Sequence, residues 1–92
     1  MEEKEEQLCA QGDQAEDLLS ADAFNATVNS LVEQTFQAFC NSKPADTEAR
    51  ERSFNHYRAL VDIVNTLQQR VAIRDEIIAK QQTDDINQSE EE

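Results

Sequence analysis

The stretch that decides the fold is Tyr57–Ile78, YRALVDIVNTLQQRVAIRDEII. Apolar residues recur in it every three or four positions, which is the spacing of one face of an α-helix. No glycine or proline interrupts this pattern, and we expect the helix to run over about residues 47–82. One neighbouring helix in a chain of 92 residues cannot cover so much apolar surface. The sequence therefore raises the question of what else packs against it.

Heptads divide this stretch into repeats with β-branched residues at position a and Leu at position d. Such repeats favour parallel two-stranded coiled coils, because position a accepts a side chain that branches at Cβ. Arg74, at a d position, interrupts the pattern. Further apolar residues lie at positions where a simple dimer carries charge, among them Phe54, Val61 and Ile63, so we expect more than one neighbour. The predicted self-association interface consists of Tyr57, Leu60, Val64, Leu67, Val71 and Ile78.

A second amphipathic pattern occupies residues 21–40. Its apolar side chains, from Phe24 to Phe39, again fall on one face of a helix. Ser20 or Asp22 is expected to cap the start of this helix, because a side-chain oxygen can accept a free amide of the first turn.

The segment NSKPAD, residues 41–46, ends this pattern. Pro44 cannot continue a helix, and Asp46 can cap the next one. The two helices are therefore predicted to form an antiparallel hairpin over residues 20–82. Four aromatic residues that flank the turn are predicted to form a core there: Phe36, Phe39, Phe54 and Tyr57.

The ends of the chain are acidic and poor in apolar residues. Residues 1–19 are predicted to form a helical segment whose apolar stripe is thin and is weakened by Gly12. Such a segment covers the far end of the long helix only in part. Residues 83–92 have the composition of a disordered acidic tail. The predicted fold is thus all-α, an antiparallel helical hairpin with an N-terminal helical segment and a long C-terminal helix with coiled-coil-like heptads.

The formal net charge of −12 is concentrated at the two ends. Residues 1–17 hold seven acids and one Lys, and residues 84–92 hold five acids and no base, whereas residues 18–83 are nearly neutral with eight acids and seven bases. Direct binding of nucleic acid needs clustered Lys and Arg, and here the bases alternate with acids. The sequence therefore predicts protein partners and no direct contact with nucleic acid.

Residues that carry out catalysis or bind metals are scarce. The single histidine, His56, lies at the edge of the apolar stripe and is expected to be a surface residue. One glycine cannot form a phosphate-binding loop, and the paired carboxylates lack the spacing of a calcium site. Cys9 and Cys40 are expected to remain free thiols, since a helical arrangement separates them. We expect no enzymatic activity, no cofactor and no metal.

The sequence shows no signal peptide pattern and no pattern of a membrane-spanning segment. The opening MEEKEEQL is acidic where a signal peptide would be basic, and no window holds enough consecutive apolar residues for a membrane span. The sequence therefore predicts a soluble, cytoplasmic protein.

The order of these segments has a counterpart in one group of proteins. An acidic start, a helix opening SADAFN, a loop NSKPADTEARERS and a long helix YRALVDIVNTLQQRV together resemble the small acidic helical proteins from the head and packaging genes of tailed bacteriophages. The resemblance covers roughly residues 18–80 and includes no catalytic motif. It implies a structural, scaffolding or assembly accessory in the cytoplasm of a bacterial host or in a virion.

Several explanations remain for the surplus apolar face. A homo-oligomer, most simply a dimer whose two hairpins form a four-helix bundle, is the preferred one. A monomeric three-helix unit and a groove kept open for a foreign protein are the others. The alternative function is that of an acidic decoy, a nucleic-acid mimic that inhibits a nucleic-acid-binding enzyme by presenting carboxylates in place of phosphates.

Overall fold

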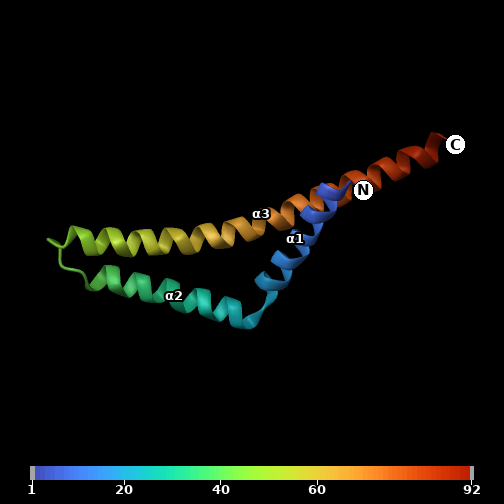
Figure 1. Ribbon diagram of the computed structural model, residues 1–92. Coiled ribbons are helices and arrows are strands. Elements are labelled where there is room, and N and C mark those ends of the chain that lie inside the picture. The colour runs from blue at the N-terminus through green and yellow to red at the C-terminus, as the bar shows by residue number, and fades with distance from the viewer. Residues whose placement is uncertain (1, 92) are drawn as a thin grey trace. The chain divides into compact units, whose positions relative to one another are not determined.

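Three helices make up the described part of the chain. The computed structural model describes the backbone of residues 2–91 and the side chains of residues 2–86. The helices are α1 (Glu3–Ser20), α2 (Asp22–Asn41) and α3 (Thr47–Glu91) (Figure 1). The prediction of an all-α fold, with a helical hairpin, an N-terminal helical segment and a long C-terminal helix, is confirmed.

The chain divides into two compact units, and α3 contributes to both. In one unit α1, up to Leu18, packs against α3 from Leu67 onward. In the other, residues 19–66, α2 lies antiparallel to the first part of α3 (Figure 1). The apolar stripe of α3 therefore faces two helices of its own chain, one in each unit.

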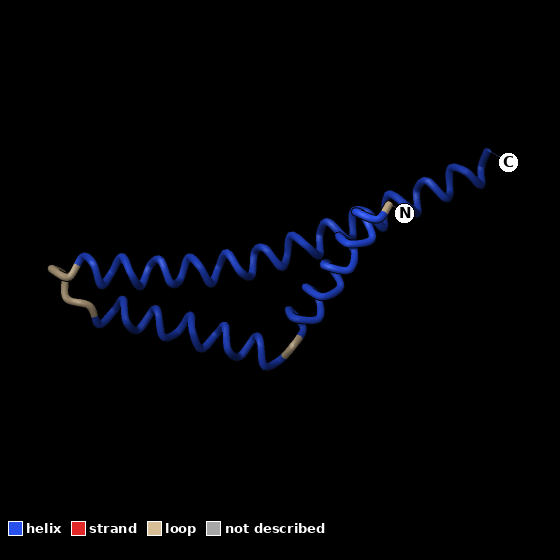
Figure 2. The backbone as a smooth tube through the Cα atoms, in the orientation of Figure 1, coloured by secondary structure: helices blue, strands red, loops and turns tan. Residues whose placement is uncertain are grey.

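The turn between α2 and α3, drawn in tan in Figure 2, is stabilised by local hydrogen bonds. Ser42 follows the last residue of α2, and both its backbone N–H and its Oγ donate to the carbonyl oxygen of Phe39, at 3.2 and 2.6 Å. At the start of α3, the Oδ1 atom of Asp46 accepts the backbone N–H of Ala49 at 3.1 Å. This is the geometry of a helix N-cap. The predicted role of Asp46 is confirmed.

Replacing Asp46 with Ala should lower the free energy of unfolding by about 0.5–2 kcal/mol, because the amide of Ala49 loses its acceptor. Urea unfolding followed by circular dichroism measures this loss. Asp46→Asn, which keeps an oxygen acceptor in the same place, is the matched control and should retain most of the stability. Equal stability of the wild type and Asp46→Ala would contradict the cap.

The start of α2 differs from the prediction that Ser20 or Asp22 caps it. Ala21 is the N-cap residue, with extended backbone (φ −77°, ψ 123°) and no side-chain hydrogen bond. Ser20 is still part of α1 and Asp22 already belongs to α2, so neither occupies the capping position. The side chain of Asn25 donates instead to the carbonyl of Leu19 at 2.8 Å, which satisfies one acceptor at the end of α1.

Helix α3 continues to Glu91, through most of the segment for which the sequence predicts a disordered tail. No glycine or proline occurs after Pro44, so no residue type in this segment breaks a helix. Glu92 lies outside the described residues.

A close approach of two helices positions α1 on α3. Gly12 and Ala15 are both buried. A Cβ atom at Gly12 would lie 2.8 Å from the backbone carbonyl oxygen of Arg70 and even closer to the Cβ of Arg74. Both positions must therefore be small, because α1 approaches the backbone of α3 itself. Gly12, which weakens an isolated helix, is the residue that permits this contact.

The guanidinium group of Arg74 completes the contact between α1 and α3. Its Nη1 donates to Asp13 at 2.9 Å and to Glu16 at 2.8 Å, and its Nη2 donates to Asp75 at 2.8 Å. These hydrogen bonds, the one to Glu16 above all, raise the pKa of Arg74 further above its ordinary value. The side chain of Arg74 is only 10% exposed, whereas its three partners remain mostly in solvent. The residue that interrupts the heptads is thus the one that pairs with α1.

Candidate protein-interaction surface

The described residues form almost no hydrophobic core. Among the apolar residues whose side chains are described, Ala15 alone is buried, with 2% of its surface exposed. Ten large apolar side chains are between 39% and 59% exposed. They are Leu18, Leu31, Phe36, Phe39, Phe54, Tyr57, Ile63, Ile73, Ile78 and Ile86. Apolar surface that stays in water on this scale indicates an interaction surface.

Four of these side chains, all aromatic, gather on one side of the α2–α3 hairpin. Four aromatic residues line a single open hollow of about 400 Å³, together with Val32, Glu33, Thr35 and Ser53. We call this surface the aromatic face. It comprises Val32, Phe36 and Phe39 of α2, and Phe54 and Tyr57 of α3.

The aromatic face contains all four residues that the sequence assigns to a core at the turn. The structure brings them together but leaves them 46–59% exposed. Thr35 and Ser53 line the same hollow and are half-buried and buried, so they lie nearer the boundary between the helices than the rings do. The rings therefore stand beside the helix boundary and not within it.

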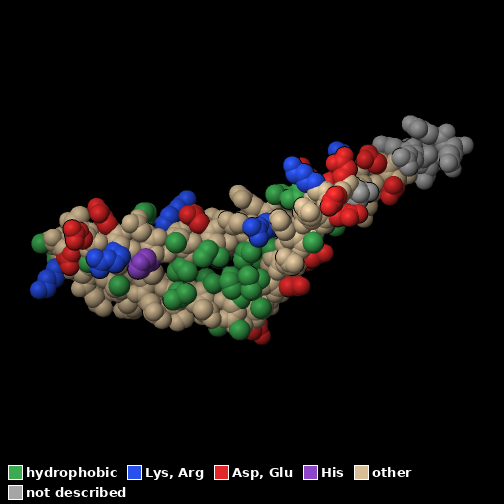
Figure 3. All heavy atoms as spheres, viewed as in Figure 1, with side chains coloured by type: hydrophobic (Ala, Val, Ile, Leu, Met, Phe, Trp, Pro, Cys, Tyr) green, Lys and Arg blue, Asp and Glu red, His purple; other side chains and the backbone are tan. Residues whose placement is uncertain are grey.

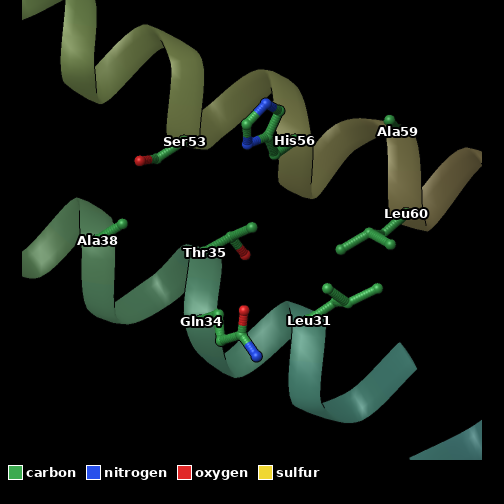
Figure 4. A pocket seen from close by; sticks show the side chains of 8 residues that line it. All are labelled: Leu31, Gln34, Thr35, Ala38, Ser53, His56, Ala59 and Leu60. Carbon is green, nitrogen blue, oxygen red and sulfur yellow. The ribbon is translucent and has the colours of Figure 1, made fainter. Parts of the chain in front are cut away.

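The other side of the hairpin carries a second open hollow (Figure 4). Leu31 of α2 and Leu60 of α3 point toward one another at one end of it, and His56 lies nearer the turn (Figure 4). Figure 3 shows hydrophobic side chains along the boundary between α2 and the neighbouring part of α3. His56 is exposed and is not among the donors or acceptors of a side-chain hydrogen bond. This hollow thus offers apolar surface from both helices, with the exposed His56 in its lining.

The residues of the predicted self-association interface fall into two groups. Tyr57 and Ile78 are exposed, at 46% and 39%. The other four are half-buried, on the line of α3 that leads from Ser53 to Arg74 and faces the chain's own helices. They are Leu60, Val64, Leu67 and Val71. The heptad seam is therefore already in contact with α2 and α1, whereas the aromatic face is open.

Charge is distributed unevenly between the two units. Residues 1–18 and 67–92 hold fourteen acids and four bases, a net charge of −10. Residues 19–66 hold six acids and four bases, a net charge of −2. Within α2, Asp22 and Glu33 are the only charged residues. A helix with so few charges can enter an interface at a small desolvation cost.

No other kind of site emerges from the part of the chain that the structure describes. It contains no cluster of three His, Cys, Asp or Glu side chains that could hold a metal ion. Cys9 is half-buried and Cys40 is exposed, both as free thiols. None of the described helices is long and apolar enough to span a bilayer.

The fold and this surface define a class of protein, an all-α helical protein with an exposed apolar face suited to protein–protein association. Comparisons with protein-family models, curated proteins and solved structures found no match to the chain.

Proposed function

We propose that this chain is a non-enzymatic interaction protein that self-associates through its long helix α3. The observation that carries the proposal is the near absence of a core within one chain: Ala15 is buried, while ten large apolar side chains are exposed. Ordering a chain costs about 1–2 kcal/mol per residue in backbone entropy, and burial of apolar surface must offset that cost. Association supplies the burial that one chain lacks.

The particular form of the proposal is an accessory role in assembly, as a structural or scaffolding protein. The resemblance to small acidic proteins of phage head and packaging genes implies this role, and with it a bacterial host cytoplasm or a virion as the location. The support on the molecular side is the helical hairpin with its open aromatic face. A further protein would then bind to the assembled oligomer.

The molar mass in solution tests the proposal. Light scattering coupled to size exclusion, over a range of chain concentrations, should give a mass near twice the 10.5 kDa of one chain. A mass that stays at that of one chain up to high micromolar concentration would contradict self-association and favour a foreign partner for the apolar surface.

The second candidate function is the acidic decoy. It is supported by the helical structure of α1, which holds the acidic side chains of this segment in an ordered arrangement. Six of the acidic side chains in residues 2–17 are exposed. They are Glu2, Glu3, Glu6, Asp13, Glu16 and Asp17. Two of them, Asp13 and Glu16, bind Arg74, which reduces their use as phosphate mimics. A decoy has no need to self-associate, so the same mass measurement separates the two functions.

A further inference from the structure

We infer that the aromatic face is the contact through which two copies of this chain associate, each face lying against the same face of the other copy. This inference rests on the proposed self-association and specifies the surface responsible. It differs from pairing along the heptad seam, which the sequence alone favours. Three observations lead to a second copy as the occupant: the exposed aromatic side chains, the distribution of charge and the position of Arg74.

The exposed aromatic side chains are the surface that a partner would cover. Phe36, Phe39, Phe54 and Tyr57 are 46–59% exposed around one open hollow. Contiguous exposed apolar surface of this kind marks protein–protein contacts in soluble proteins.

Charge selects the unit through which two identical chains can meet. The unit that contains α1 carries most of the negative charge, so two such units repel each other. The hairpin unit is nearly neutral, and α2 brings only Asp22 and Glu33 to it. Aromatic side chains and a scarcity of charge are the composition of an interface core. A strongly basic partner would instead match the acidic unit.

The heptad seam is a poor contact for a second copy. Leu60, Val64, Leu67 and Val71 are already half-buried within the chain. In a parallel pair, position d faces position d, so Arg74 of one copy would meet Arg74 of the other. Its guanidinium is also bound to Asp13 and Glu16 of its own α1. Among the residues that line the hollow of the aromatic face, Glu33 alone is charged.

Two copies related by a two-fold axis would each contribute the same residues to the contact. Phe36, Phe39, Phe54 and Tyr57 are each 46–59% exposed in one chain and would be covered together. Large aromatic side chains gathered at the centre of a patch are the residues that dominate binding energy in protein interfaces.

The only tyrosine provides a test that needs no substitution. The chain has one Tyr and no Trp, so its ultraviolet fluorescence reports on Tyr57. Quenching by acrylamide should weaken at least about two-fold between dilute samples with the mass of one chain and concentrated samples with the mass of two, because the 46% exposed ring becomes covered. A doubled mass with unchanged quenching would overturn the inference and leave self-association intact. A constant single-chain mass would contradict self-association itself.

A pair of matched variants tests the same surface by mass. Phe36→Asp should raise the dissociation constant about 100-fold, because it places a carboxylate in the aromatic contact. Ile63→Asp makes a similar change at a side chain that is also about half exposed, on the side of α3 that carries His56, and should leave the constant within about three-fold. The reverse order of effects would show that the other side of the hairpin is the contact.

Cross-linking remains informative if Phe36→Asp does not fold. In a Cys9→Ser, Cys40→Ser background, Phe39→Cys should give covalent dimers with a short bismaleimide, and Ile63→Cys should give few. Dimers from Ile63→Cys alone would overturn the inference.

Discussion

Replacing Gly12 with Ala lowers the free energy of unfolding by about 1–3 kcal/mol, although Ala is the better helix former. The added Cβ would lie 2.8 Å from the carbonyl oxygen of Arg70 and still closer to the Cβ of Arg74. Neither of these atoms belongs to the free end of a side chain, so α1 must move away from α3. The gain in helix propensity, up to about 1 kcal/mol, does not offset this overlap. Urea unfolding followed by circular dichroism measures the difference.

The control for Gly12→Ala is Gln14→Ala, two positions along α1 at an exposed site. There the side chain meets solvent, and we expect a change within about 0.5 kcal/mol. If Gly12→Ala proved as stable as the wild type, α1 would not depend on its close approach to Arg70 and Arg74.

The second large effect is expected at Leu67, at the centre of the heptads. Leu67 is half-buried. Leu67→Asp removes apolar contacts and places a carboxylate in a partly apolar position, at a cost of roughly 3 kcal/mol. Because α3 belongs to both units, we expect the oligomer to be lost together with helix content, as measured by light scattering and circular dichroism.

Asp62→Lys is the control for Leu67→Asp on the outer side of the same helix. The side chain of Asp62 is 59% exposed and lies 3.5 Å from Arg58, and such surface pairs contribute little. Stability and mass should both stay near those of the wild type. If Asp62→Lys dissociated the oligomer while Leu67→Asp did not, the assignment of inner and outer sides of α3 would be wrong.

The parts of the fold that depend on neighbouring residues were predictable from the sequence. Pro44 cannot continue the first helix, and Asp46, two residues later, caps the next one, so the hairpin follows from local chemistry. The break at Ala21 was placed one residue off, because Ser20 and Asp22 are better capping residues by type but are both helical.

Contacts between distant residues were not predictable in the same way. Arg74 and Asp13 are 61 positions apart in the sequence, and the heptad pattern identifies Arg74 only as an interruption. From the sequence alone, Gly12 is a residue that weakens its helix, whereas the structure places it next to the backbone of Arg70. One signal does exist in the sequence. Gly12 and Ala15 lie on one face next to two acids, which matches an arginine on a facing helix.

The aromatic residues show what helical spacing in a sequence does not predict. Helical spacing groups Phe36, Phe39, Phe54 and Tyr57 correctly but does not say whether they point between the helices or beside them. The structure shows the second arrangement: the four rings are 46–59% exposed, whereas Ser53, which lines the same hollow, is buried.

The contact of Gly12 and Arg74 also fixes the register of α1 on α3. A slide of α1 by one helical turn, about 5.4 Å, would bring Leu8 or Glu16 to the place of Gly12. Either side chain would collide with the backbone at Arg70, and the same slide would carry Asp13 away from the guanidinium of Arg74. Steric fit and charge thus select the same alignment, so a helix with little apolar surface is held in a single position along its neighbour.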